Sequence, residues 1–245
     1  MALKIENGKI VGTIDNLEAK LEGEIPITRE ELLVLVNSWG RAQSFYIFDI
    51  NQDIDIEECK AKECYDLSKL DTSEITDMSQ LFYYSEFNGD ISNWDISNVT
   101  NMNMMFYNAF NFNSDLSKWD VSNVTSMEGT FLRAKKFNSD IGNWNISNVK
   151  NMSSLFSYVE NFNSDISKWN LENIDCDYMF DNAKAFYKKF NNNIPLPSEN
   201  NDIKEWLNNN RDIMKAIDTK ANYKNEIDNF FSNFSNIELN NILGR

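Results

Sequence analysis

The sequence contains no histidine, and only eight of its 245 residues are glycine, three are proline and three are cysteine. Without histidine, the chain lacks the usual general base near neutral pH and the commonest metal ligand. The cysteines Cys59, Cys64 and Cys176 are odd in number and do not suggest a disulfide framework. Cys59 and Cys64 either pair or stay free, and no fourth ligand completes a zinc site. We therefore expect no metal centre and no cofactor.

Basic residues are also scarce, with 23 lysines and arginines against 38 aspartates and glutamates and a formal net charge of −15. Such a surface repels nucleic acid phosphates and anionic membranes, so we expect no nucleic acid partner. No apolar run is long enough to span a bilayer, and we expect no membrane insertion. The acidic surplus either serves solubility alone or favours a basic protein partner.

The motifs of common enzyme classes are missing as well. The sequence has no phosphate loop, zinc motif, dinucleotide-binding glycine fingerprint or nucleophile elbow. Its acidic residues are numerous enough for a hydrolase that uses paired carboxylates, but nothing selects one pair. We therefore expect a protein that is not an enzyme, with the hydrolase as a remote alternative.

What the sequence does contain is a repeat with a step of 25 residues. Tryptophans keep this step at Trp94, Trp119, Trp144 and Trp169, and aspartates keep it at Asp90, Asp115, Asp140 and Asp165. A unit of this size cannot bury its apolar side alone, whereas stacked units form a continuous core. The repeat therefore predicts a solenoid over residues 66–192.

Each unit combines two periodicities. Trp94 and Ile96 alternate with polar residues, as in a short strand. Val99, Met102 and Phe106 then recur at three and four residues, which is typical of a short helix or an irregular helical turn. The predicted fold class is therefore an α/β solenoid.

The tryptophan and aspartate columns are interpreted as structural ladders. A tryptophan that recurs in every unit indicates core packing more than a carbohydrate platform. Three of the four aspartates follow Asn-Ser, a usual turn position, so we expect each aspartate to cap backbone N–H groups of its own turn. The alternative is that the acidic row collects cations. The asparagine column that begins at Asn88 is expected to bond backbone groups of its own turn and of the next unit.

Residues 1–65 do not follow the repeat and are predicted to form a small α/β cap, with a separate binding domain as the alternative. Asn7-Gly8 predicts a hairpin. Thr28 to Glu31 reads as a capping box that starts a helix ending near residue 39, before Gly40. One or two strands are predicted over residues 45–56. Alternating acidic residues over 49–57 resemble the start of a calcium loop, but the required glycine and final glutamate are missing.

Residues 193–245 carry two apolar stripes with helical spacing, the first from Ile203 to Ile217 and the second from Tyr223 to Phe234. Ser198 is placed to cap the first helix, and residues 235–238 form another capping box. We predict a helical C-terminal cap. The alternative is a helical unit that binds a partner or dimerises.

Specificity in a repeat protein must come from the positions at which the copies differ. Those positions cluster in loops that begin near residues 83, 107, 132 and 157. Aromatic and arginine side chains are favoured as interface anchors. We therefore predict a protein-binding edge whose candidate residues are Tyr83, Tyr84, Tyr107, Arg133, Lys135 and Tyr158.

The repeat resembles that of the BspA-like leucine-rich repeat surface proteins, whose relatives include repeat lipoproteins of mycoplasmas. In one unit the matching residues are Phe112, Asn113, Asp115, Trp119, Asp120, Ser122, Asn123, Val124, Thr125, Met127 and Phe131. The resemblance implies a leucine-rich-repeat-like stack and an adhesin-like surface or secreted role in binding proteins of host or neighbouring cells. It carries over no catalytic residue.

The residues at the start of the chain favour a different location. Met1–Gly8 contains no apolar run of signal-peptide length, which taken alone favours the cytoplasm. The alternative function is therefore a cytoplasmic acidic binding protein, such as an immunity factor or an inhibitor of a basic partner.

Overall fold

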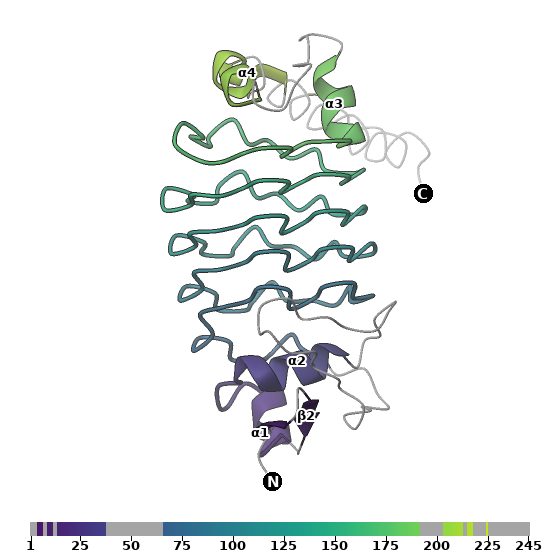
Figure 1. Cartoon of the computed structure of the whole chain (residues 1–245), viewed down its shortest axis with the longest axis vertical. Helices are drawn as coiled ribbons and strands as arrows, with labels where there is room; N and C mark the ends of the chain where they lie inside the picture. The colour runs from purple at the N-terminus through teal and green to yellow at the C-terminus, as the bar shows by residue number, and fades with distance from the viewer. Residues whose placement is uncertain are drawn as a thin grey trace, which may run out of the picture.

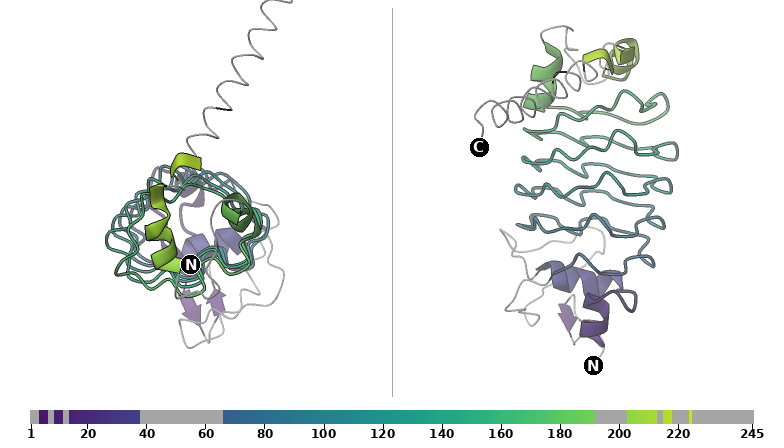
Figure 2. Two further views of the ribbon diagram at one scale, coloured as in Figure 1. Left: turned by 90° about the horizontal axis from the view of Figure 1, so that it is seen from above. Right: turned by 180° about the vertical axis from the view of Figure 1, so that it is seen from behind.

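Figure 1 shows a computed structural model of the chain, and the structure describes residues 4–6, 9–11, 14–37, 66–191, 203–212, 215–217 and 224. From residue 66 onward the backbone winds into successive coils that stack along the long axis of the molecule, and they superimpose when viewed down the stack (Figure 2). Helices α1 (Leu17–Leu21) and α2 (Arg29–Asn37) lie at one end. Helices α3 (Lys184–Asn191) and α4 (Ile203–Asn209) lie at the other.

The N-terminal segment contains the hairpin and the helix start that the sequence predicts. Strands β1 (Lys4–Glu6) and β2 (Lys9–Val11) pair antiparallel, with Glu6 opposite Lys9. At α2 the backbone N–H of Glu31 donates to Thr28 Oγ1 at 3.3 Å, and the N–H of Thr28 donates to Glu31 Oε2 at 3.0 Å. The reciprocal bonds confirm the capping box.

Helix α2 is attached to the first coil by polar and apolar contacts. The Arg29 guanidinium donates to the carbonyl oxygens of Asp77 at 3.0 Å and Ser79 at 2.8 Å. The apolar face of α2 is buried in the same core as the coils, through Leu32, Leu33, Leu35 and Val36. The helix thus covers apolar surface that the end of a stack would otherwise expose.

Within the coils, residues 66–183, all of which the structure describes, form neither an α-helix nor an extended strand. Single-residue parallel bridges link successive coils: Asp77 to Asn101, Asn101 to Ser126, Ser126 to Asn151, and Asn151 to Asp175. Trp94 and Ile96, predicted to be strand-like, pair with no neighbouring strand. The N–H of Trp94 instead donates within a turn to Ile91 at 3.2 Å.

The segment predicted to be helical is an irregular series of turns. The N–H groups of Met105, Tyr107 and Ala109 donate to the carbonyl three residues earlier, whereas those of Met104 and Phe106 donate to the next coil. Because alternate N–H groups leave their own coil, a continuous α-helix cannot form. The assignment to an α/β, leucine-rich-repeat-like class stays a prediction, as do the domain boundaries.

This alternation requires residues with a left-handed backbone. Two positions four residues apart in each coil have positive φ: Gln80 and Tyr84, Met104 and Asn108, Gly129 and Arg133, Ser154 and Tyr158, Tyr178 and Asn182. Most of these residues are neither glycine nor asparagine, the types for which this conformation is least costly. The hydrogen bonds between coils hold the backbone in this conformation.

Aromatic ladders fill the interior of the stack. One contains Phe82, Phe106, Phe131, Phe156 and Phe180, with neighbouring ring centroids 5.2–5.9 Å apart. A second contains Phe87, Phe112, Phe137, Phe162 and Phe186, with spacings of 6.1–6.4 Å. All ten rings are almost fully buried, so each coil completes the core of its neighbours.

At the far end, Trp206 and Leu207 of α4 are buried in the common core. Cys176 is a buried free thiol, and its burial raises its pKa to about 12. In the part of the chain that the structure describes, no helix has the length and apolarity needed to cross a membrane.

The predictions for Gly40, the strands over 45–56, the calcium loop, Cys59 and Cys64 lie outside the described residues. So do those for Ser198, the stripe from Tyr223 and the capping box at 235–238.

Candidate functional site

The variable loops of successive coils lie in register along one edge of the stack. The N–H of Asn108 donates to the carbonyl of Leu132 at 2.9 Å, that of Arg133 to Ser157 at 2.9 Å, and that of Tyr158 to Asp181 at 2.6 Å. These bonds fix the loop backbones, so the side chains that the loops carry have defined neighbours. We call the loops 83–86, 107–111, 132–136 and 157–161, with residues 181–185, the variable edge.

Three of the predicted binding residues, Tyr83, Tyr84 and Tyr107, form a tyrosine cluster on the first two loops of this edge. The rings of Tyr83 and Tyr107 stack with centroids 4.8 Å apart, and Tyr84 lies 4.8 Å from Tyr83 and 5.4 Å from Tyr107. Burial, with smaller contributions from Tyr107 and Tyr84, raises the pKa of Tyr83 to about 12. Burial and a hydrogen bond with Tyr84 also raise the pKa of Tyr107, an effect that Arg133 partly offsets.

Arg133 and Tyr158 continue the edge beyond this cluster. The Arg133 guanidinium carbon lies 5.3 Å from the centroid of the Tyr158 ring, a cation–π distance. Arg133 is exposed, and the Tyr158 side chain is 42% exposed. The ring is therefore accessible to a second molecule even though it contacts the guanidinium.

Lys135 belongs to a second row on the same loops, with three residues that the sequence prediction missed. Its Nζ lies 5.7 Å from the Phe110 ring centroid and 3.4 Å from Glu160 Oε1. Lys184 Nζ lies 3.5 Å from the same oxygen. The hydrogen bond and charge of Lys135, helped by Lys184, lower the pKa of Glu160. Phe110 and Glu160 were detectable from the sequence because they occupy the same variable loops.

The tryptophan column lies in the interior, as a core ladder requires. Trp94, Trp119 and Trp144 each donate the indole N–H to a carbonyl of the preceding coil, of Leu67, Ile91 and Leu116, at 2.8, 3.0 and 3.0 Å. The buried Nε1 of Trp169 has no partner among the described residues. The ladder is therefore incomplete at its last step.

The aspartate column has the geometry of turn caps. Asp90, Asp115, Asp140 and Asp165 each accept the N–H of the residue two positions later, at 2.9, 2.9, 3.3 and 2.8 Å. The Ser117 N–H and hydroxyl lower the pKa of Asp115. The asparagines form a parallel ladder, in which the N–H of Asn113 donates to Asn88 Oδ1 at 2.9 Å and this arrangement repeats up the stack.

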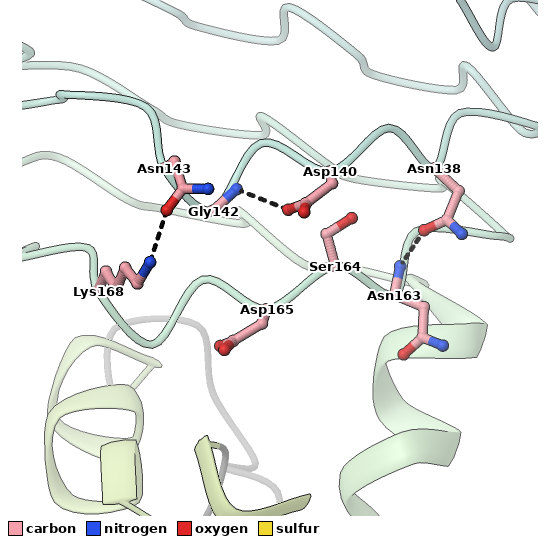
Figure 3. Close-up of a pocket in the computed structure, with 8 residues that line it drawn as sticks. All are labelled: Asn138, Asp140, Gly142, Asn143, Asn163, Ser164, Asp165 and Lys168. Carbon is pink, nitrogen blue, oxygen red and sulfur yellow. Dashed lines mark hydrogen bonds between the residues drawn. The ribbon is translucent and has the colours of Figure 1, made fainter. Parts of the chain in front are cut away.

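A polar pocket lies along these ladders, between the last two clear repeats (Figure 3). Its lining consists of Asn138, Asp140, Gly142, Asn143, Asn163, Ser164, Asp165 and Lys168. A Cβ atom on Gly142 would lie only 1.9 Å from the Asp165 carbonyl oxygen, so the coils approach closely here. The described residues contain no group of three or more acidic, cysteine or histidine side chains placed to hold a metal. The sequence feature that marks this pocket is Gly142, which stands where the other repeats have serine.

The coils thus stack in register around aromatic ladders, and loops of differing sequence lie along one edge. A family model described as Mycoplasma protein of unknown function, DUF285, matches residues 53–148, 85–194 and 119–219. Together these overlapping matches cover more than half of the sequence, and the chain belongs to this family. No curated protein and no solved structure matches the chain.

Proposed function

We propose that this chain is a non-catalytic protein-binding solenoid of the leucine-rich-repeat-like type and that it binds its partner through the variable edge. The observation that carries this proposal is a difference in variability between equivalent positions of successive coils. Residues of the interior and of the turn caps repeat from coil to coil, whereas the loops that share an edge present tyrosine, phenylalanine, arginine and lysine. A scaffold that fixes varied side chains on a constant backbone is suited to recognition.

The composition of the edge supports a protein partner. Tyrosine, phenylalanine and arginine are enriched at protein interfaces, because they combine a large contact area with polar groups. Phe110 and Tyr158, each 42% exposed, remain available for contact. Hydrogen bonds between the loops already order their backbones, so less conformational entropy is lost when a partner binds.

The resemblance of the repeat to BspA-like surface proteins supports a place at the cell surface. The second candidate is an intracellular inhibitor of a basic protein, which the net charge of −15 favours. Protease treatment of intact producing cells, with lysed cells as the control, separates the two. Loss of the protein from intact cells supports the surface role, and survival until lysis contradicts it.

Photo-crosslinking tests the edge itself. A benzophenone amino acid is placed at Tyr158 and, as the matched control, at Glu172, which is also exposed but lies outside the edge loops. Purified protein is irradiated on intact cultured host cells. We expect a discrete adduct from position 158 and none from position 172. Equal adducts at both positions, or none at 158, would contradict binding through this edge.

A further inference from the structure

The basic residues of this acidic protein are concentrated near one end of the variable edge. The loops 132–136 and 157–161, with residues 181–191, contain six basic side chains: Arg133, Lys135, Lys136, Lys184, Lys188 and Lys189. The same segments contain two carboxylates, Glu160 and Asp181, so their net charge is four positive charges. The whole chain has a net charge of −15. We call these three segments the basic edge.

Backbone hydrogen bonds make the basic edge one continuous surface. The N–H of Arg133 donates to Ser157 at 2.9 Å, that of Asn161 to Lys135 at 3.1 Å, and that of Ala185 to Glu160 at 3.1 Å. Segments bonded in this way lie about 5 Å apart. The ammonium groups of Lys135 and Lys184, on two different segments, lie 3.4 and 3.5 Å from the same oxygen of Glu160, so these two charges lie within one screening length of about 8 Å at physiological salt.

Little within the described residues neutralises this charge. Glu160 is shared by Lys135 and Lys184, and its lowered pKa keeps it ionised. No carboxylate of the described residues pairs with Arg133, Lys136 or Lys188, all of which are exposed. Like charges held together and left unpaired repel one another, and an anionic partner would relieve that repulsion.

We propose that the basic edge binds an acidic polypeptide segment; this inference rests on the proposed function and names its partner. The positive charge selects an anionic ligand. The rings of Phe110 and Tyr158, beside Lys135 and Arg133, offer apolar contacts that a polypeptide uses better than a sulfated polysaccharide does. The positive charge of this edge therefore favours an acidic partner, whereas the net charge of the whole chain favours a basic one.

A pair of triple variants separates the contribution of this edge to binding from the effect of the whole protein's net charge. The edge variant carries Arg133→Glu, Lys136→Glu and Lys188→Glu. The control carries Lys118→Glu, Lys150→Glu and Lys168→Glu, also at exposed positions but outside the basic edge. Both variants change the net charge equally, so a general electrostatic effect would weaken binding by the same factor in both. Thermal melting verifies that each variant folds.

The probe is a random library of short displayed peptides, selected on the full chain. We expect the enriched peptides to have negative net charge and aromatic residues. In fluorescence anisotropy, the edge variant should bind them at least about tenfold more weakly, whereas the control should stay within about threefold of the original chain. Adding salt should weaken binding to the original chain.

Several outcomes would overturn the assignment: no enrichment, neutral or basic enriched peptides, or equal loss in both variants. Heparin retention that the edge variant loses, without enrichment of acidic peptides, would replace the polypeptide with a sulfated glycan. Enriched basic peptides that still bind at the edge would leave the proposed function standing. If the library yields no acidic peptides and no crosslinked adduct forms from position 158, both proposals are refuted.

Discussion

Replacing tryptophans of the ladder by phenylalanine should destabilise the fold unequally. Trp144 donates its buried indole N–H to the Leu116 carbonyl at 3.0 Å, whereas the buried Nε1 of Trp169 in the next repeat has no partner among the described residues. Both side chains are 3–4% exposed, so the loss of ring volume is matched. The difference between Trp144→Phe and Trp169→Phe therefore reports the free energy of pairing the buried indole N–H.

The magnitude follows from the cost of unsatisfied polar groups. Trp144→Phe removes a bond worth about 0.5–1.5 kcal/mol and leaves the buried Leu116 carbonyl without this donor. Trp169→Phe removes a donor whose burial without a partner already costs about 1–3 kcal/mol. The free energy of unfolding should therefore be lower in Trp144→Phe than in Trp169→Phe, by about 1.5–4.5 kcal/mol.

Urea denaturation followed by far-UV circular dichroism measures this difference without using tryptophan fluorescence. With a slope of about 2 kcal/mol per molar urea, the two midpoints should differ by roughly 0.8–2.2 M. Trp119→Phe, which loses a bond to Ile91 of 3.0 Å, should behave like Trp144→Phe. Equal midpoints for the substitutions at 144 and 169 would refute the reasoning.

Three further predictions follow from the coil geometry. Gly142→Ser restores the residue of the other repeats but places Cβ 1.9 Å from the Asp165 carbonyl oxygen. This clash should cost about 1–3 kcal/mol of stability and lower the melting temperature, and an unchanged or higher melting temperature would contradict the geometry. The lowered pKa values of Asp115 and Asp120 give stability that is complete above their unfolded pKa, near 4, and is lost as the pH falls through the folded pKa. Asp120→Asn should flatten its share of this loss in melts at decreasing pH while the cap survives, since the oxygen of Asn145 caps the same turn in the next repeat. Tyr178→Asn should raise stability by about 0.5–1 kcal/mol in urea melts, because Tyr178 has φ +58° and is 58% exposed; a lower midpoint would show that the ring contributes to the fold.

Sequence reasoning was most accurate where a short pattern fixes a local hydrogen bond. The hairpin and the capping box of Thr28 and Glu31 depend only on residues close together in the chain. The burial of the tryptophan column and the capping geometry of the aspartates were also within reach of the sequence, because both recur with the period. Periodicity averages over copies and so reveals what all coils share.

Sequence reasoning was weakest where the geometry depends on neighbouring coils. Spacings of three and four residues at Val99, Met102 and Phe106 fit a helix and a series of turns equally well. The choice is made by N–H groups that bond the next coil, a contact between residues about 25 positions apart. The shared pairing of Glu160 with Lys135 and Lys184 likewise depends on the register between loops.

The left-handed positions connect the cost of the scaffold with the edge it presents. Tyr84, Arg133 and Tyr158 share one such column with Asn108 and Asn182. Asparagine tolerates this conformation, whereas larger side chains there cost about 1–2 kcal/mol each. A chain selected for stability alone would carry asparagine or glycine throughout this column. Arg133 and Tyr158 carry this conformational cost at exposed positions. Such residues are typical of sites where the side chain itself is used, which is the role that binding at the variable edge would give them.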